Sequence, residues 1–88
     1  MNAKYERTLE RVFADPTPAN LKWQDIESML VSLGATISEG SGSRVRVELN
    51  GVIAVFHRPH PSPDTKRYAV RNIRDFLIAA GIRLDSEK

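Results

Sequence analysis

The two histidines of the chain are the side chains best suited to acid–base chemistry. His57 and His60 stand in the run His57-Arg58-Pro59-His60-Pro61. Cleavage of RNA through its 2′-hydroxyl needs a base to remove that proton and an acid to protonate the leaving oxygen, and imidazole performs both tasks near neutral pH. We take His57 and His60 as candidate catalytic residues. The alternative interpretation is that both are ordinary solvated residues, one on a strand and one in a loop.

A metal site is a weaker interpretation of the same spacing. His57-x-x-His60 resembles a pair of metal ligands, but the chain has no cysteine, and the carboxylate nearest in sequence is Asp64. The lack of cysteine also excludes a disulfide scaffold, a thiolate metal site and a cysteine nucleophile. We therefore expect neither a bound metal nor another cofactor.

A β-hairpin is predicted to place His57 beside two arginines. Residues 43–49 alternate between two faces, and Asn50-Gly51 is typical of a two-residue hairpin turn, in which both central residues need positive φ. This turn fixes the register. The expected pairs are Leu49 with Val52, Val47 with Ala54 and Val45 with Phe56 toward the core, and Glu48 with Ile53, Arg46 with Val55 and Arg44 with His57 on the open face. Arg44, Arg46 and His57 should then form one cationic cluster.

Apolar residues at helical spacing predict three helices. They are expected at residues 3–14, at residues 23–33, and from a cap at Asp64 or Thr65 to Gly81. Pro16 ends the first helix because proline cannot continue the hydrogen-bond ladder, and Gly34 suits the left-handed cap after the second. The segment before the last helix holds three prolines between residues 59 and 63, so it must be a loop.

The order of these elements predicts one α+β domain. A short strand at residues 35–39 precedes the hairpin, so the core reads α-β-β-β-α after an extra N-terminal helix. Two helices with apolar stripes cover one face of a three-stranded antiparallel sheet and leave the other face open. We expect a single domain over residues 1–88, with an N-terminal helical extension (1–18), a core (19–83) and a frayed tail (84–88).

Positive charge is concentrated in the second half of the chain. Residues 43–74 hold seven Lys/Arg and two Asp/Glu, a net charge of +5, whereas the whole chain carries +2. Such a patch is typical of a surface that meets phosphates, and a solvated face without a partner explains the charge equally well. The candidate RNA-binding residues are Arg44, Arg46, Arg58, Lys66 and Arg67. No apolar run approaches the roughly 20 residues of a membrane span, and no signal peptide is recognisable, so we expect a cytoplasmic protein.

Several short motifs follow one another along the chain. They are the helix from Trp23 to Gly34, Gly42-Ser43-Arg44 at the start of a strand, the Asn-Gly hairpin, the Arg58-Pro59-His60-Pro61 loop and the closing helix to Gly81. Together these motifs resemble the HicA family of bacterial toxins. The resemblance covers residues 21–82. It implies a double-stranded-RNA-binding-like fold, cleavage of mRNA, and a HicB antitoxin that covers the active site.

One position departs from the family's usual motif. The family has Gly-Ser-His, whose histidine is catalytic, and the matching residue here is Arg44. A guanidinium stays charged and cannot shuttle a proton, so the catalytic role does not pass to Arg44. His60 matches the histidine of the family's proline-flanked loop, although the prolines are arranged differently.

Three hypotheses remain open. The first is a HicA-like toxin that binds and cleaves mRNA, with the chemistry moved to His57 or His60. The second is a module that binds RNA or a protein partner and cleaves nothing. The third is an interaction domain whose basic face pairs with an acidic protein.

Overall fold

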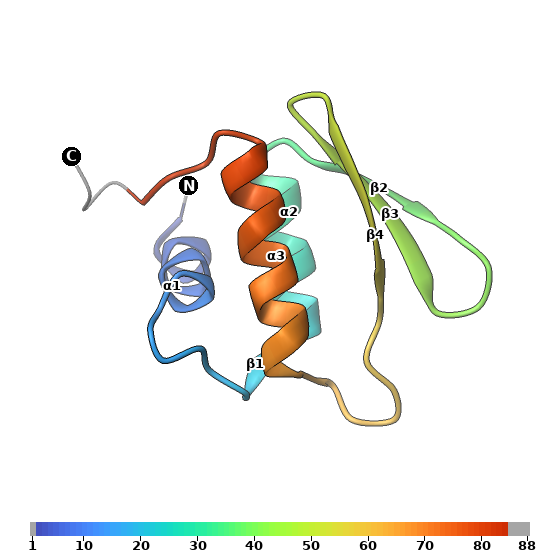
Figure 1. Cartoon of the computed structure of the whole chain (residues 1–88), viewed down its shortest axis with the longest axis horizontal. Helices are drawn as coiled ribbons and strands as arrows, with labels where there is room; N and C mark the ends of the chain where they lie inside the picture. Colours follow the sequence, from blue (N-terminus) through green and yellow to red (C-terminus); the bar gives the residue numbers. More distant parts are fainter. Residues whose placement is uncertain (1, 85–88) are drawn as a thin grey trace.

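The computed structural model describes residues 2–84, which form three helices and five strands. In chain order they are α1 (Ala3–Val12), β1 (Leu21–Lys22), α2 (Trp23–Ser32), β2 (Thr36–Glu39), β3 (Arg44–Leu49), β4 (Val52–His57), β5 (Asp64–Thr65) and α3 (Arg67–Ala79). The α2 and α3 helices cover one face of the sheet β2-β3-β4, and α1 lies on the far side of these helices (Figure 1). This is the predicted α+β fold, a double-stranded-RNA-binding-like core preceded by a helix. No described helix is long and apolar enough to cross a membrane.

The hairpin has the predicted register. Asn50 and Gly51 form its turn with φ values of 52° and 83°, the positive values that this type of turn requires. All six pairs of β3 with β4 agree with the prediction, from Leu49 opposite Val52 to Arg44 opposite His57. On β3 the side chains of Val45, Val47 and Leu49 are buried against the helices, so Arg44, Arg46 and Glu48 are exposed on the other face.

The start of the last helix was predicted wrongly. The α3 helix begins at Arg67, and its N-cap residue is Lys66 rather than Asp64 or Thr65. Asp64 and Thr65 instead form β5, an antiparallel partner of β1, with Thr65 opposite Leu21. A local pattern does not reveal this pairing because each strand has only two residues and the partners lie far apart in the sequence.

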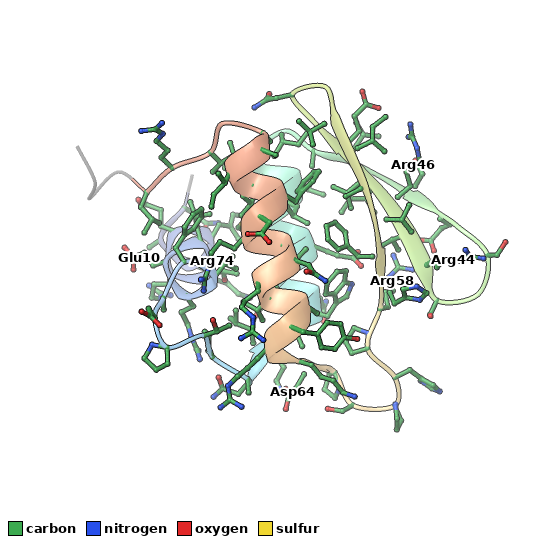
Figure 2. The ribbon with its side chains drawn as sticks, in the orientation of Figure 1. Glu10, Arg44, Arg46, Arg58, Asp64 and Arg74 are labelled. Carbon is green, nitrogen blue, oxygen red and sulfur yellow. The ribbon has the colours of Figure 1, made fainter. Side chains whose placement is uncertain are left out.

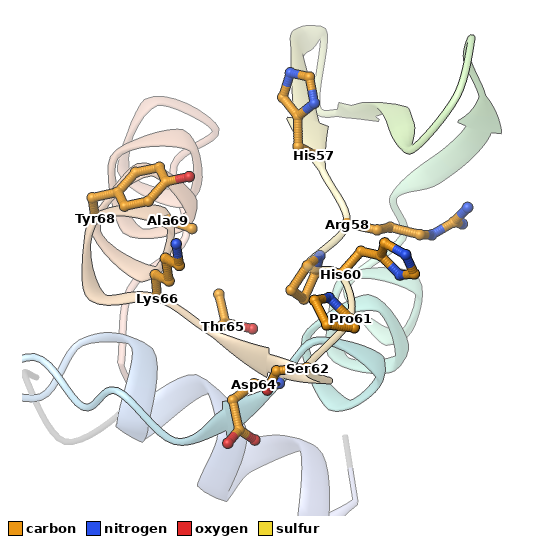
Figure 3. Close-up of a pocket in the computed structure, with 11 residues that line it drawn as sticks. His57, Arg58, His60, Pro61, Ser62, Asp64, Thr65, Lys66, Tyr68 and Ala69 are labelled. Atoms are coloured by element: carbon orange, nitrogen blue, oxygen red, sulfur yellow. Dashed lines mark hydrogen bonds between the residues drawn. The ribbon is translucent and has the colours of Figure 1, made fainter.

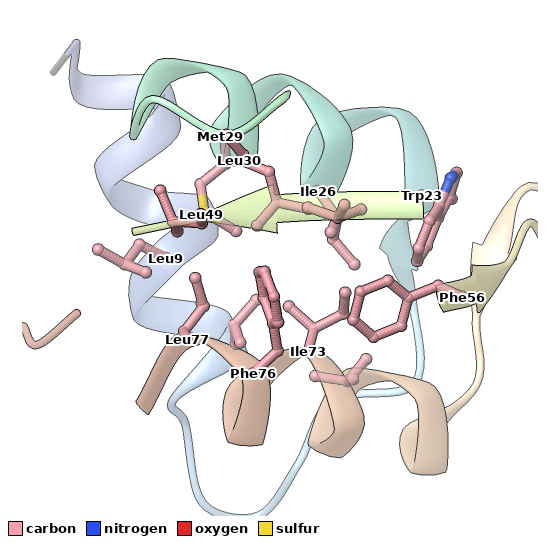
Figure 4. Close-up of a cluster of buried hydrophobic side chains, with 14 of the residues drawn as sticks. Leu9, Trp23, Ile26, Met29, Leu30, Leu49, Phe56, Ile73, Phe76 and Leu77 are labelled. Atoms are coloured by element: carbon pink, nitrogen blue, oxygen red, sulfur yellow. The ribbon is translucent and has the colours of Figure 1, made fainter. Parts of the chain in front are cut away.

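One apolar core holds the two helices on the sheet (Figure 4). Phe56 of β4 lies between them: its ring centroid is 6.2 Å from that of Trp23 in α2 and 5.6 Å from that of Phe76 in α3, the latter pair being edge-to-face. Aromatic pairs at such distances stabilise beyond the area that they bury. Phe56 therefore fixes the end of β4, and with it the neighbouring His57.

The N-terminal helix shares this core. Leu9 and Val12 are buried in it. The Arg74 side chain of α3 donates from Nε to the Val12 carbonyl at 2.9 Å and from its NH2 group to the Ala14 carbonyl at 2.9 Å. These carbonyls lie where a helix end lacks backbone partners, so Arg74 acts as a cap for α1. Of the predicted frayed tail, Leu84 packs partly buried against the core, and residues 85–88 lie outside the described residues.

Candidate nucleic-acid interface

The open face of the sheet carries two arginines, one histidine and two exposed apolar side chains. Arg44 lies opposite His57, and Arg46 lies opposite Val55. Val55 is 56% exposed and Ile53 is 51% exposed. Figure 2 shows Arg46 projecting from the sheet on the side away from the helices. The predicted cluster of Arg44, Arg46 and His57 is therefore present on one surface.

The two arginines differ in their electrostatic surroundings. Arg46 NH1 lies 3.8 Å from Glu48 Oε1, a long ion pair whose two side chains are about half exposed. Arg44 makes no ion pair with any residue of the described chain, 2–84. Because solvent screens a long, exposed pair, Glu48 holds Arg46 only weakly. Both guanidinium groups are thus accessible to an anion.

Arg58 does not join this cluster, although the sequence placed it among the candidate RNA contacts. Strand alternation turns residue 58 to the face opposite His57. There its guanidinium bonds Glu27 of α2 (Nε to Oε2, 2.8 Å) and Glu39 of β2 (NH1 to Oε1, 2.6 Å), while Trp23 Nε1 donates to the same Glu27. The Arg58 side chain thus has a structural role, because it joins α2, β2 and the start of the loop.

The pKa values of this network show the same pairing. The hydrogen bond from Arg58 lowers the pKa of Glu39 below its ordinary value of 4.5. The hydrogen bonds to Glu39 and then to Glu27 raise the pKa of Arg58. Each charged form is stabilised by its partner. A phosphate would have to displace two carboxylates to reach Arg58.

A pocket of about 340 Å³ lies between the end of β4 and the start of α3. His57 stands at one side, His60 and Pro61 at another, and Lys66 and Tyr68 on the helix side (Figure 3). The structure thus brings both histidines and Lys66 around one pocket. Sequence reasoning missed Tyr68, which lies outside the apolar stripe of α3 and is 59% exposed.

Backbone hydrogen bonds fix both ends of the loop that carries His60. The Arg58 N–H donates to the Ser43 carbonyl at 2.9 Å, and the Trp23 N–H donates to the Pro63 carbonyl at 3.0 Å. The β1–β5 pair continues from this second anchor. The loop is therefore held against α2 at one end and against the turn before β3 at the other.

The remaining candidate contact, Arg67, lies on the other side of the helix start. Its Nε donates to the Thr17 carbonyl at 3.0 Å, in the segment after α1. This bond uses one of its five donor groups, and the side chain is exposed. Within residues 2–84, no three His, Asp or Glu side chains are grouped as ligands of a metal ion.

The comparisons with known proteins agree with this architecture. The family model described as the HicA toxin of bacterial toxin–antitoxin systems matches residues 23–82, about two thirds of the chain. Neither the curated proteins nor the solved structures give a match. The matched segment runs from the first residue of α2 to just beyond α3, so it contains the whole sheet, the loop and both covering helices. The chain therefore belongs to the HicA family of toxins from bacterial toxin–antitoxin systems.

Proposed function

We propose that this protein is a HicA-type toxin that binds mRNA on the open face of its sheet and cleaves it with His57 and His60. The observation that carries the proposal is the pair Arg44 and His57, which face each other at the end of the hairpin. The same His57 lines the pocket that His60 and Lys66 also line. A phosphate held by Arg44 would thus lie beside the His57 imidazole, with His60 on the same pocket.

The reaction that suits these groups is attack by the ribose 2′-hydroxyl on the adjacent phosphorus. One imidazole removes the proton of that hydroxyl, a new oxygen–phosphorus bond forms, and the bond to the 5′-oxygen breaks. The other imidazole donates a proton to the departing 5′-oxygen. Arg44 and Lys66 balance the charge that develops on the non-bridging oxygens. The products are a 2′,3′-cyclic phosphate and a 5′-hydroxyl end.

The same face supports a protein partner of the kind that the family implies, a HicB-like antitoxin. Ile53 and Val55 are apolar and more than half exposed, and Arg46 lies beside them. Exposed aliphatic side chains with cations at their edge are typical of a surface that a partner covers. An antitoxin seated there would cover Arg44 and His57 and so block access of RNA.

A second candidate is a module on the same fold that binds RNA without cleaving it. It is favoured by Arg44, which stands where the family has its catalytic histidine. The test compares the parent, the double variant His57→Ala/His60→Ala and the control Arg7→Ala, which alters an exposed residue of α1. We expect the double variant to lose RNA cleavage by about a hundredfold or more and to lose growth arrest on induction, because it lacks both proton-transfer groups.

Two results would decide against the nuclease. If the double variant cleaves RNA and arrests growth like the parent, the histidines are not catalytic. If the parent binds RNA but neither cleaves it nor arrests growth, the binding module replaces the nuclease. Arg7→Ala should behave like the parent in both assays.

A further inference from the structure

The first turn of α3 is an uncompensated positive end of a helix. This helix has thirteen residues, its N-cap is Lys66, no side chain caps it, and no acidic residue lies in its first turn. The Ala69 N–H already donates to the Lys66 carbonyl at 3.0 Å, so the N–H groups of Arg67 and Tyr68 are the ones without an intrahelical acceptor, and the helix dipole adds a partial positive charge there. Anions bind readily at this kind of position, provided that the surroundings form a site.

A buried hydroxyl beside this helix end lacks a partner. Thr65 is 1% exposed, and its Oγ1 makes no hydrogen bond within the described chain. The residue lines the pocket between β4 and α3, and its oxygen is turned toward the loop that carries Pro61 (Figure 3). A buried hydroxyl without a partner costs folding free energy, and valine would fill the same volume without that cost. The unpaired oxygen therefore points to a ligand.

The charges around the pocket favour a ligand with negative charge. Lys66 lines it and makes no ion pair within residues 2–84. Asp64 is the only carboxylate among the lining residues, and its Oδ1 is bound to Lys22 Nζ at 2.7 Å. Figure 3 shows Asp64 directed away from the other lining side chains. The pocket thus offers donors and positive charge to an anion.

We propose that this pocket is a phosphate-binding site formed by the Thr65 hydroxyl, Lys66 Nζ and the N–H groups of Arg67 and Tyr68 at the start of α3. Its ligand is a phosphate group of the bound RNA, so the inference rests on the proposed function for its natural ligand. His57 lines the same pocket and also faces Arg44, so a strand that crosses it can place one phosphate on α3 and another on the open face of the sheet. The site would hold the RNA in a fixed register next to the histidines.

The first test uses inorganic phosphate and the amide NMR signals of the full chain. Phosphate should shift the amide signals of Arg67 and Tyr68, at the helix end, more than those of α1. In Thr65→Val, phosphate affinity should fall about tenfold, the scale of one hydrogen bond to a charged group. Thr65→Ser keeps the hydroxyl and should keep the affinity. Thr8→Val is the matched control, because Thr8 is also buried but its hydroxyl already donates to the Lys4 carbonyl at 3.2 Å.

Thermal unfolding separates a ligand-binding hydroxyl from a structural one. Thr65→Val should unfold at a melting temperature equal to or above that of the parent, because it removes a buried polar atom that has no partner. A lower melting temperature for Thr65→Val together with unchanged phosphate affinity would overturn the proposal, because the hydroxyl would then serve the fold. Unchanged amide signals at Arg67 and Tyr68 on addition of phosphate would overturn it as well.

RNA oligonucleotides distinguish failure of this site from failure of the proposed function. Thr65→Val should bind single-stranded RNA about tenfold more weakly than the parent, like the phosphate itself. If Thr65→Val binds and cleaves RNA at the parental level, the pocket is not an RNA subsite and the nuclease stands. If the parent binds phosphate at α3 but does not bind RNA, then neither the pocket nor the open face of the sheet is an RNA site, and both proposals are overturned. Tighter binding of oligonucleotides that end in a 5′-phosphate than of those that end in a 5′-hydroxyl would identify the ligand as a terminal phosphate. Equal binding of the two kinds would identify it as a phosphate within the strand.

Discussion

Arg44 and His57 occupy opposite positions at the open end of the β3–β4 hairpin. The relationship follows from the turn, because a two-residue connection at Asn50-Gly51 leaves one register for the six pairs that follow. A shift of β4 by one residue would send His57 toward the helices and expose the apolar side chains of that strand. The cationic site is thus fixed by the same pairing that fills the core.

RNA binding should depend on salt through the arginines of the open face. Each phosphate contact that is lost should reduce the slope of log K against log salt by about 0.7 for a single strand. We expect Arg44→Ala and Arg46→Ala each to cause such a reduction, as measured by fluorescence anisotropy over a salt series. Arg7→Ala on α1 should keep the parental slope. An unchanged slope in Arg44→Ala would show that the Arg44 side chain does not contact a phosphate of the RNA.

Acid pH should weaken the ion pair between Arg58 and Glu39. The hydrogen bond from Arg58 keeps the pKa of Glu39 below 4.5 in the folded chain, so this pair stabilises the fold fully above that value. The stabilisation is lost as the pH falls through the lowered pKa. Glu39→Gln should therefore have a lower melting temperature than the parent at about pH 6, and the difference should shrink toward about pH 3.

The control for this experiment is Glu10→Gln, on an exposed position of α1 that makes no ion pair in the described part of the chain. It should differ little from the parent at either pH. A melting-temperature difference for Glu39→Gln that stays constant down to acid pH would show that the carboxylate contributes nothing through its charge.

Arg74 should stabilise the attachment of α1 to the rest of the fold. Its guanidinium donates to two carbonyls at the end of α1 and to Thr17 Oγ1 at 3.1 Å. Arg74→Ala should lower the free energy of unfolding by about 2 kcal/mol, the scale of hydrogen bonds from a charged donor. Arg71→Ala, at an exposed position of the same helix, should change it by less than about 0.5 kcal/mol in urea denaturation. Equal effects of the two variants would contradict the capping role.

The sequence was most informative where structure is local and periodic. The alternation along β3 and the Asn50-Gly51 turn are enough to pair Arg44 with His57. The partners of Arg58 were not predictable, because Glu27 and Glu39 approach it only after α2 and β2 have packed together. The start of α3 was misplaced for a similar reason, since Thr65 pairs with Leu21 across a long separation. The pocket depends on both of these long-range contacts, so the position of the Thr65 hydroxyl in it could not be predicted from the sequence.

Replacement of the ribose at the cleaved position should separate binding from chemistry. In the proposed reaction the 2′-hydroxyl is the nucleophile, whereas the arginines and Lys66 contact phosphates, which RNA and DNA share. An oligonucleotide with a single 2′-deoxyribose at that position should bind within about twofold of the all-ribose strand, because its phosphates are unchanged. Its cleavage at that position should fall by at least about a hundredfold, because no proton is available for His57 or His60 to remove.

The ends of the products provide an independent measurement. Attack by the 2′-hydroxyl leaves a 2′,3′-cyclic phosphate and a 5′-hydroxyl, which mass spectrometry of the fragments identifies. Attack by water need not involve the 2′-hydroxyl, so it would tolerate the deoxyribose and leave no cyclic phosphate. Products of that second kind would show that the 2′-hydroxyl is not the nucleophile. The assignment of His57 and His60 as base and acid of a 2′-hydroxyl attack would then be wrong, even if both are needed for cleavage.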